Sequence, residues 1–98
     1  MRLKLFFLVT LHVSLIAKTK PVKGHIIDED SNVLENVSIM SLPSMTNTKS
    51  DKQGLFSFLV PIRDRKLVIS MQGYQPDTLS VILFKNKTYI VLKEYVID

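Results

Sequence analysis

The sequence predicts an all-β fold, a seven-stranded β-sandwich built from antiparallel or mixed sheets. Seven short segments alternate apolar and polar residues, which is the period of a half-buried strand. Turn signals rich in Gly, Pro, Asn and Asp separate these segments about every 8–12 residues. No segment after residue 17 has a helical period, and the only alanine of the chain lies in the N-terminal apolar stretch. Together these observations are typical of a small β-sandwich.

The first 17 residues have the pattern of a cleavable signal peptide. Arg2 and Lys4 supply the positive charge at the start, and residues 5–17 form an apolar run with three polar interruptions. This run is too short to cross a bilayer, which needs about 20 apolar residues. We expect cleavage after Ala17 and a mature domain of residues 18–98. The alternative is that residues 1–17 form a buried strand or helix of the folded body.

The composition restricts the classes of function. The 98 residues allow one domain, and the apolar fraction of 46% is enough for a core. The net charge of +4 falls to +2 without Arg2 and Lys4, so nucleic-acid binding is not expected. The chain has no cysteine, which excludes disulfides, thiolate nucleophiles and cysteine zinc sites. An exported chain without disulfides suggests a bacterial cell envelope, either the periplasm or the outer membrane.

The expected strands follow one another through short polar turns. Val22, Gly24 and Ile26 share one face of the first strand. Pro43 and Pro61 end the second and fourth strands, because proline cannot donate a hydrogen bond to a ladder. The seven expected strands cover residues 22–28, 37–42, 46–50, 54–60, 66–71, 78–84 and 88–97.

The predicted fold is organised around the turn and strand of residues 50–58. Asp51 is suited to accept hydrogen bonds from the backbone of its own turn. Gly54 provides a position where a positive φ has no steric cost. Phe56 and Phe58 then point to the core, while the residues between them point to solvent. Further along, Gly73 and Tyr74 indicate a bend followed by a half-buried ring whose hydroxyl reaches the backbone.

No group of residues has the pattern of a catalytic or cofactor site. Residues 28–32, Asp-Glu-Asp-Ser-Asn, begin like a calcium loop, but Val33 and Ile39 stand where that loop needs Gly and Glu. We therefore expect a solvated turn there, and no metal site. His25 is the only histidine after residue 17 and has no partner at the spacing of a triad or a metal site. The sequence thus predicts a protein that is not an enzyme and has no cofactor.

Four segments in order resemble the carboxypeptidase-regulatory-like (CarboxypepD_reg-like) domain. They are the opening strand at residues 22–28, Leu34 with residues 37–39, the Thr/Ser-Asp-x-x-Gly-x-Phe turn within residues 48–58, and the strand ending in Gly-Tyr at residues 67–74. The resemblance covers nearly all of residues 21–93 and implies a transthyretin-like (prealbumin-like) sandwich. The residues that it implies have structural turn or core roles are Gly24, Asp51, Gly54, Phe56, Phe58, Gly73 and Tyr74.

The resemblance also implies a setting for the domain. In bacterial envelopes this domain often stands at the N-terminus of TonB-dependent outer-membrane receptors, directly after a signal peptide. This sequence has neither the plug nor the barrel of such a receptor, so we expect a free-standing copy or the front part of a longer protein. The expected function is a non-catalytic accessory or interaction domain that binds an envelope protein through a sheet edge, at residues 46–50 or 89–97. The alternative is a carbohydrate-binding module, for which only Tyr74, Tyr89 and Tyr95 could stack on sugar rings.

Overall fold

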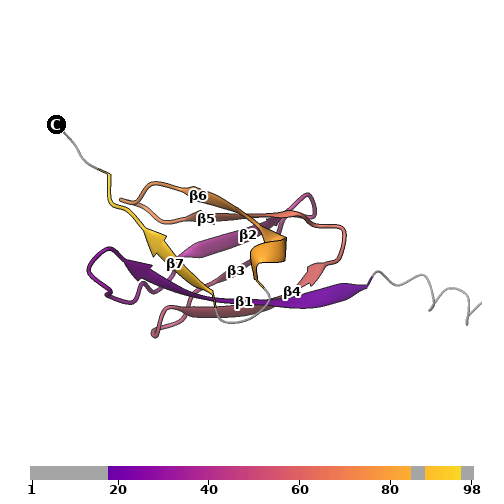
Figure 1. Ribbon diagram of the computed structural model, residues 1–98, viewed down its shortest axis with the longest axis horizontal. Coiled ribbons are helices and arrows are strands. Elements are labelled where there is room, and N and C mark those ends of the chain that lie inside the picture. The colour runs from indigo at the N-terminus through magenta and orange to yellow at the C-terminus, as the bar shows by residue number, and fades with distance from the viewer. Residues whose placement is uncertain (1–17, 85–87, 96–98) are drawn as a thin grey trace, which may run out of the picture.

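The computed structural model describes residues 18–84 and 88–95 (Figure 1). The predicted all-β fold with seven strands is confirmed. One short 3-10 helix, η1, interrupts the strands near the C-terminus. The elements in order are β1 (Thr19–Asp28), β2 (Ser38–Leu42), β3 (Thr46–Lys49), β4 (Leu55–Pro61), β5 (Lys66–Ser70), β6 (Asp77–Ser80), η1 (Val81–Leu83) and β7 (Tyr89–Leu92).

The strands form two sheets that pack face to face as a sandwich (Figure 1). One sheet has three strands in the order β4-β1-β7, and the other has four in the order β3-β2-β5-β6. All neighbouring strands are antiparallel except β1 and β7, which run parallel. Of the two predicted arrangements, antiparallel or mixed, the sandwich is therefore mixed. β7 and β3 are edge strands, as are β4 and β6.

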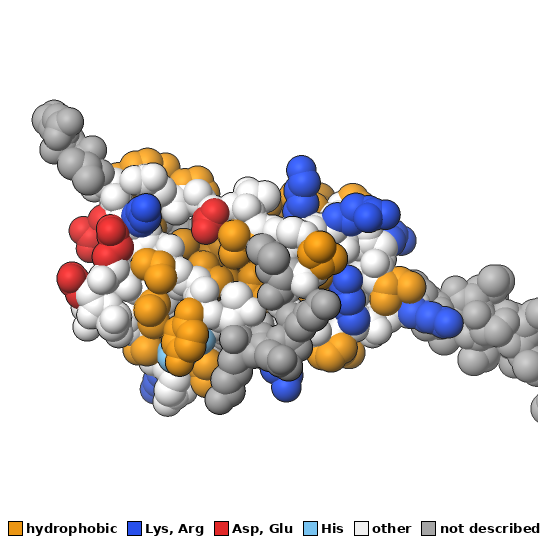
Figure 2. Space-filling view, viewed as in Figure 1, with side chains coloured by type: hydrophobic (Ala, Val, Ile, Leu, Met, Phe, Trp, Pro, Cys, Tyr) orange, Lys and Arg blue, Asp and Glu red, His pale blue; other side chains and the backbone are white. Residues whose placement is uncertain are grey.

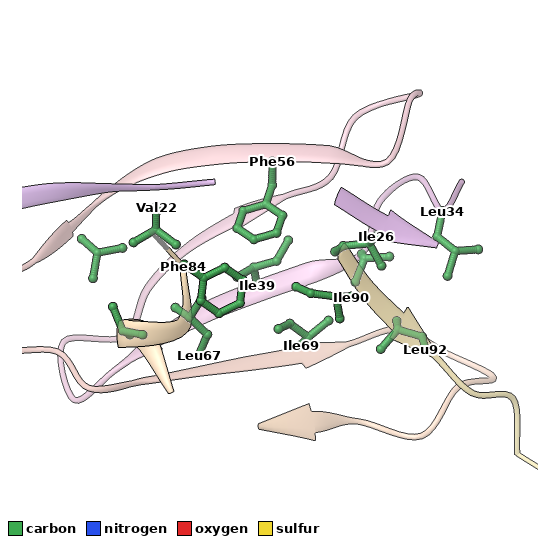
Figure 3. Packing of buried hydrophobic residues seen from close by; sticks show 13 residues of the cluster. Val22, Ile26, Leu34, Ile39, Phe56, Leu67, Ile69, Phe84, Ile90 and Leu92 are labelled. Carbon is green, nitrogen blue, oxygen red and sulfur yellow. The ribbon is translucent and has the colours of Figure 1, made fainter. Parts of the chain in front are cut away.

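The core consists of apolar side chains that both sheets direct into the space between them (Figure 3). Burying each such side chain stabilises the fold by about 1.5–3 kcal/mol. The Phe56 ring points from β4 toward Ile39 and Phe84 (Figure 3). The buried members are Val22, Ile26, Leu34, Val37, Ile39, Phe56, Val60, Leu67, Ile69, Val81, Phe84, Ile90 and Leu92.

The pairing of β1 with β4 places Gly24 directly opposite Phe56. A Cβ atom at position 24 would lie 2.5 Å from Cζ of that ring and still closer to Cε2. The buried ring therefore occupies the space that a side chain at position 24 would need. Gly24 is required here for close packing between two strands, since both residues are buried.

The expected strand at residues 78–84 is correct for residues 78–80 and wrong from residue 81 onward. β6 ends at Ser80, and η1 follows. Val81 N donates to Arg65 O at 2.9 Å, and Phe84 N donates to Val81 O at 3.0 Å. In a strand, residues three apart point to opposite faces, whereas in a 3-10 turn they lie on one side. The turn thus buries Val81 and Phe84 together, which a strand could not do.

The ends of the other strands differ from the expected ones by small amounts, with two exceptions. β1 begins at Thr19, because Thr19–Pro21 already pair with Leu59–Pro61 of β4. The expected last strand was too long: β7 ends at Leu92, and Glu94 forms an isolated bridge with Tyr74. Residues 96–97 of that expected strand, like the expected signal peptide at residues 1–17, lie outside the described residues.

The turn before β4 is held by both the backbone and the side chain of Asp51. The Oδ1 atom accepts hydrogen bonds from Gln53 N and Leu55 N, each at 2.9 Å. Gly54 N donates to Asp51 O at 2.9 Å, and Gly54 has a φ of +77°. A Cβ atom at position 54 would lie 2.5 Å from the backbone oxygen of Ile26. Gly54 is therefore constrained twice, by its backbone conformation and by the neighbouring strand.

We expect Gly54→Ala to lower the free energy of unfolding by about 1–3 kcal/mol, the usual range for a strained backbone position. Gly73→Ala is the matched control, because Gly73 has a φ of +90° but no atom lies within 4 Å of where its Cβ would stand. Urea unfolding of both variants should show the larger loss for Gly54→Ala, since only that variant also clashes with Ile26 O. Equal losses would mean that the backbone conformation alone requires glycine at position 54.

Candidate functional site

The outer face of the three-stranded sheet carries a contiguous apolar surface, which we call the β7 patch. Its residues form two rows across the sheet, because paired residues of neighbouring strands point to the same face. The first row is Leu55–His25–Tyr89 and the second is Val33–Ile27–Val91. His25 and Ile27 are half-buried, and the other four side chains are 41–64% exposed. Figure 2 shows hydrophobic side chains gathered over β7.

One edge of the β7 patch is the free edge of its sheet. β7 pairs with β1 on one side only, and the described residues place no further strand on its other side. His25 N donates to Thr88 O at 2.9 Å. In a parallel ladder the residues of one strand alternate between the two sides, so Tyr89 and Val91 direct their backbone groups away from β1. Tyr89 and Val91 therefore offer both apolar side chains and the backbone groups of an open edge.

The free edge is short because the residues after β7 are paired with the loop between β5 and β6. Gln75 N donates to Lys93 O at 2.8 Å, and Tyr95 N donates to Gly73 O at 3.1 Å. Glu94 also forms the isolated bridge with Tyr74. These contacts join the two sheets at one end of the sandwich. Of the expected edge at residues 89–97, only β7 itself is thus open among the described residues.

His25 lies at the centre of the β7 patch. Its ring centroid is 4.9 Å from that of Tyr89, with the two planes tilted by 35°. The Nε2 atom is buried and has no hydrogen-bond partner among the described residues. His25 thus gives the patch an aromatic, mostly apolar centre.

The residues that the sequence singled out separate into two groups in the structure. Gly24, Asp51, Gly54, Phe56 and Phe58 lie together on β1, β4 and the turn before β4. Position 54 adjoins the β7 patch, since a Cβ atom there would lie 3.1 Å from Val33 Cβ and 3.3 Å from His25 Cδ2. The second group, Gly73 and Tyr74, lies in the loop between β5 and β6.

The acidic segment at residues 28–32 is a turn organised by one of its own carboxylates. Asp28 Oδ1 accepts hydrogen bonds from Asp30 N at 2.8 Å and Asn32 N at 2.9 Å, and Oδ2 accepts one from Asn32 Nδ2 at 3.1 Å. The hydrogen bond from the Asn32 backbone is the main cause that holds the pKa of Asp28 below its usual value. Within residues 18–84 and 88–95, no three His, Asp or Glu side chains are close enough to hold a metal ion.

A buried carboxylate, Asp64, was not predicted. The sequence suggests only a charged loop at residues 63–65, yet the Asp64 side chain is fully buried. It accepts hydrogen bonds from Ser41 Oγ at 2.5 Å, from Ser44 N at 3.1 Å and from Ser44 Oγ. Burial raises the pKa of Asp64, but these hydrogen bonds and the charge of Arg63 outweigh it, so the pKa is lowered overall. Asp64 thus joins the loop after β4 to the turn between β2 and β3.

Three further findings complete the description. In the described part of the chain, no helix is long and apolar enough to span a membrane. The family model for the CarboxypepD_reg-like domain matches residues 22–97. No curated protein matches the chain.

Proposed function

Because the chain belongs to the family of CarboxypepD_reg-like domains, which are transthyretin-like sandwiches, we propose that it is a non-catalytic interaction domain of the bacterial cell envelope. Its partner is a protein, bound through the β7 patch and the open edge of β7. The observation that carries this proposal is the coincidence of an exposed apolar surface with strand backbone, at Tyr89 and Val91, that pairs with no other strand of the described residues. Exposed apolar patches of this kind are typical of interaction sites.

The geometry favours a partner that adds a strand to the sheet. An extended segment beside β7 would hydrogen-bond to the backbone of Tyr89 and Val91, which supplies affinity. Its alternate side chains would then pack beside the exposed rings and methyl groups of the patch, which supplies specificity. The other edge that the sequence suggested, β3 (Thr46–Lys49), consists of polar residues and lacks such a surface.

The setting in the envelope is supported by the sequence. Arg2 and Lys4, followed by the apolar run of residues 5–17, favour export. A phosphatase fusion made with and without residues 2–17 tests whether these residues direct export. The family resemblance supports a place at the N-terminus of a TonB-dependent receptor. An open reading frame for a plug and barrel directly downstream of codon 98 would establish that context, and its absence would favour a free-standing domain.

The proposal that the domain is non-catalytic rests on the chemistry of its ionisable residues. His25, the only histidine of the described residues, contacts Tyr89, and its Nε2 atom has no hydrogen-bond partner among them. The serine hydroxyls of Ser41 and Ser44 donate hydrogen bonds to the buried carboxylate of Asp64, and among the described residues neither has a histidine partner that could act as a base. The tyrosines of the sequence suggested a carbohydrate-binding role as the alternative. The surface that favours this role lies outside the β7 patch.

We expect photo-crosslinkers placed at positions 89 and 91 to capture the same partner protein in the source cells. Position 59 is the matched control, because Leu59 is also on the outer face of this sheet and is 61% exposed, but lies outside the patch. Val91→Pro should abolish capture from position 89, since proline removes the N–H that faces the open side. Equal capture from positions 59 and 89, or capture that survives Val91→Pro, would contradict strand addition at β7.

A further inference from the structure

A second surface of the domain has a different chemical character from the β7 patch. It is an open groove of about 860 Å³ at the end of the four-stranded sheet, where β5 leads into the loop before β6. Two tyrosines, Tyr74 and Tyr95, line it together with Met71 and Pro76. The polar residues of the lining are Asn36, Ser38, Ser70 and Gln72, whose side chains are amides and hydroxyls. We call this surface the tyrosine groove.

None of the described residues that line the tyrosine groove is charged, although charged residues make up 22% of the chain. An ionic ligand would therefore find no opposite charge in the lining. Amides and hydroxyls can both donate and accept hydrogen bonds, which suits a ligand that carries many hydroxyl groups. Tyrosine combines an apolar ring face with a polar end. A lining of uncharged polar groups and tyrosine rings therefore matches a neutral sugar, which has an apolar C–H face and a rim of hydroxyls.

The two tyrosines are held in place by the pairing that joins the two sheets. The hydrogen bond from Tyr95 N to Gly73 O fixes the backbone at Tyr95, and the bridge between Tyr74 and Glu94 fixes the backbone at Tyr74. Tyr74 packs partly against the core, whereas the Tyr95 side chain is 58% exposed. The rings thus come from segments about twenty residues apart in the sequence but lie along one groove. A ligand would not have to order either segment on binding, which preserves affinity.

The Tyr74 hydroxyl is kept in its protonated form. Burial raises the pKa of the Tyr74 phenol, and the negative charges of Glu94 and Asp28 raise it further. At neutral pH the hydroxyl can therefore donate a hydrogen bond as well as accept one. Tyr89, the third tyrosine that the sequence suggested for sugar stacking, lies on the outer face of the other sheet and takes no part.

From this lining we infer that the tyrosine groove binds a neutral oligosaccharide, with a sugar ring stacked on Tyr95 and its hydroxyls bonded to the amides and hydroxyls of the groove. This site is separate from the β7 patch and does not depend on the proposed protein partner. The two surfaces share no residue. One domain could therefore hold a glycan and a protein at the same time.

The test is an NMR titration of the 15N-labelled domain with maltohexaose, cellohexaose and chitohexaose. We expect at least one of these sugars to give saturable amide shifts confined to residues 36–38, 70–76 and 95. Tyr95→Ala should weaken that binding about tenfold, the loss expected from one aromatic contact. Tyr95→Phe, which keeps the ring, should retain it. Binding should not change in 0.5 M NaCl, because the lining carries no charge.

Tyr89→Ala is the matched control, because Tyr89 is 64% exposed but lies in the β7 patch. It should leave sugar binding unchanged while weakening capture of the protein partner, so the two proposals can fail separately. The spectrum of Tyr95→Ala without sugar verifies its fold. The inference is overturned if none of the three sugars gives saturable shifts, if the shifts lie elsewhere, or if folded Tyr95→Ala binds as well as the parent.

Discussion

Phe56→Ala is expected to lower the free energy of unfolding by about 3–5 kcal/mol, as truncations of large buried aromatic residues do. The ring is 4% exposed and makes edge-on contacts with Phe58 and Phe84, with centroids 6.1 and 6.3 Å apart. It also fills the space above Gly24. Small domains are stable by about 5–15 kcal/mol, so this variant should lose much of its stability. Urea unfolding followed by circular dichroism measures the loss.

Leu59→Ala is the control for Phe56→Ala, because it shortens an exposed side chain of the same strand. We expect it to change stability by no more than about 0.5 kcal/mol. A further variant tests the contact between the two strands. Gly24→Ala should destabilise the parent but should cost less in the Phe56→Ala background, where the ring no longer occupies the space. Additive losses, or a Phe56→Ala variant as stable as the parent, would contradict the packing described for β1 and β4.

Asp64→Ala is expected to lower the free energy of unfolding by about 2–6 kcal/mol. The substitution leaves at least two buried or part-buried donors, Ser41 Oγ and Ser44 N, without their partner. Each unsatisfied donor costs about 1–3 kcal/mol. Asp51→Ala is the matched control, since the Asp51 carboxylate also accepts two backbone hydrogen bonds but lies in an exposed turn. Water can replace those bonds, so we expect a loss of about 1 kcal/mol. Similar losses in both variants would contradict a special role for the buried carboxylate.

The pH dependence of stability provides a second measurement on Asp64. Its pKa in the folded protein is lowered from the ordinary value of 3.8. The folded state therefore favours the charged form, and the stabilisation by Asp64 is fully present above the unfolded pKa. It is lost as the pH falls below 3.8 through the folded pKa. Asp64→Asn cannot titrate at this position, so its stability should fall less than that of the parent between about pH 4 and pH 2. A parallel fall in both proteins would show that other carboxylates carry the acid sensitivity.

The strands that could be predicted are those whose side chains alternate and whose ends carry turn residues. β4 is the clearest case, because Phe56 and Val60 are buried while Leu55 and Leu59 are exposed. The turn η1 could not be predicted in this way. The residues of η1 continue the strand-like spacing of the residues before them. Only the end of the sandwich favours the tighter turn, because two apolar side chains must be buried there from the same side of the chain.

The surfaces could be predicted only in part. The sequence indicated a possible edge at residues 89–97, but it did not indicate that β7 lies parallel to β1 beside His25. The sequence indicated three tyrosines that could stack on sugars. It did not indicate that Tyr74 and Tyr95 share one groove while Tyr89 lies on another face. Asp64 carried no signal at all, since a carboxylate between two arginines in a loop is typical of solvent exposure.

By itself, the sequence determined the all-β class, the family and the turn at Asp51 and Gly54, because alternation and backbone conformation depend on residues close together in the chain. Only the tertiary structure decided which side chains form the β7 patch and the tyrosine groove, and which carboxylate is buried. These features join residues that are far apart in the sequence, and their neighbours are set by the order and direction of the strands. Strand order follows from the packing of the whole core, which no local pattern contains.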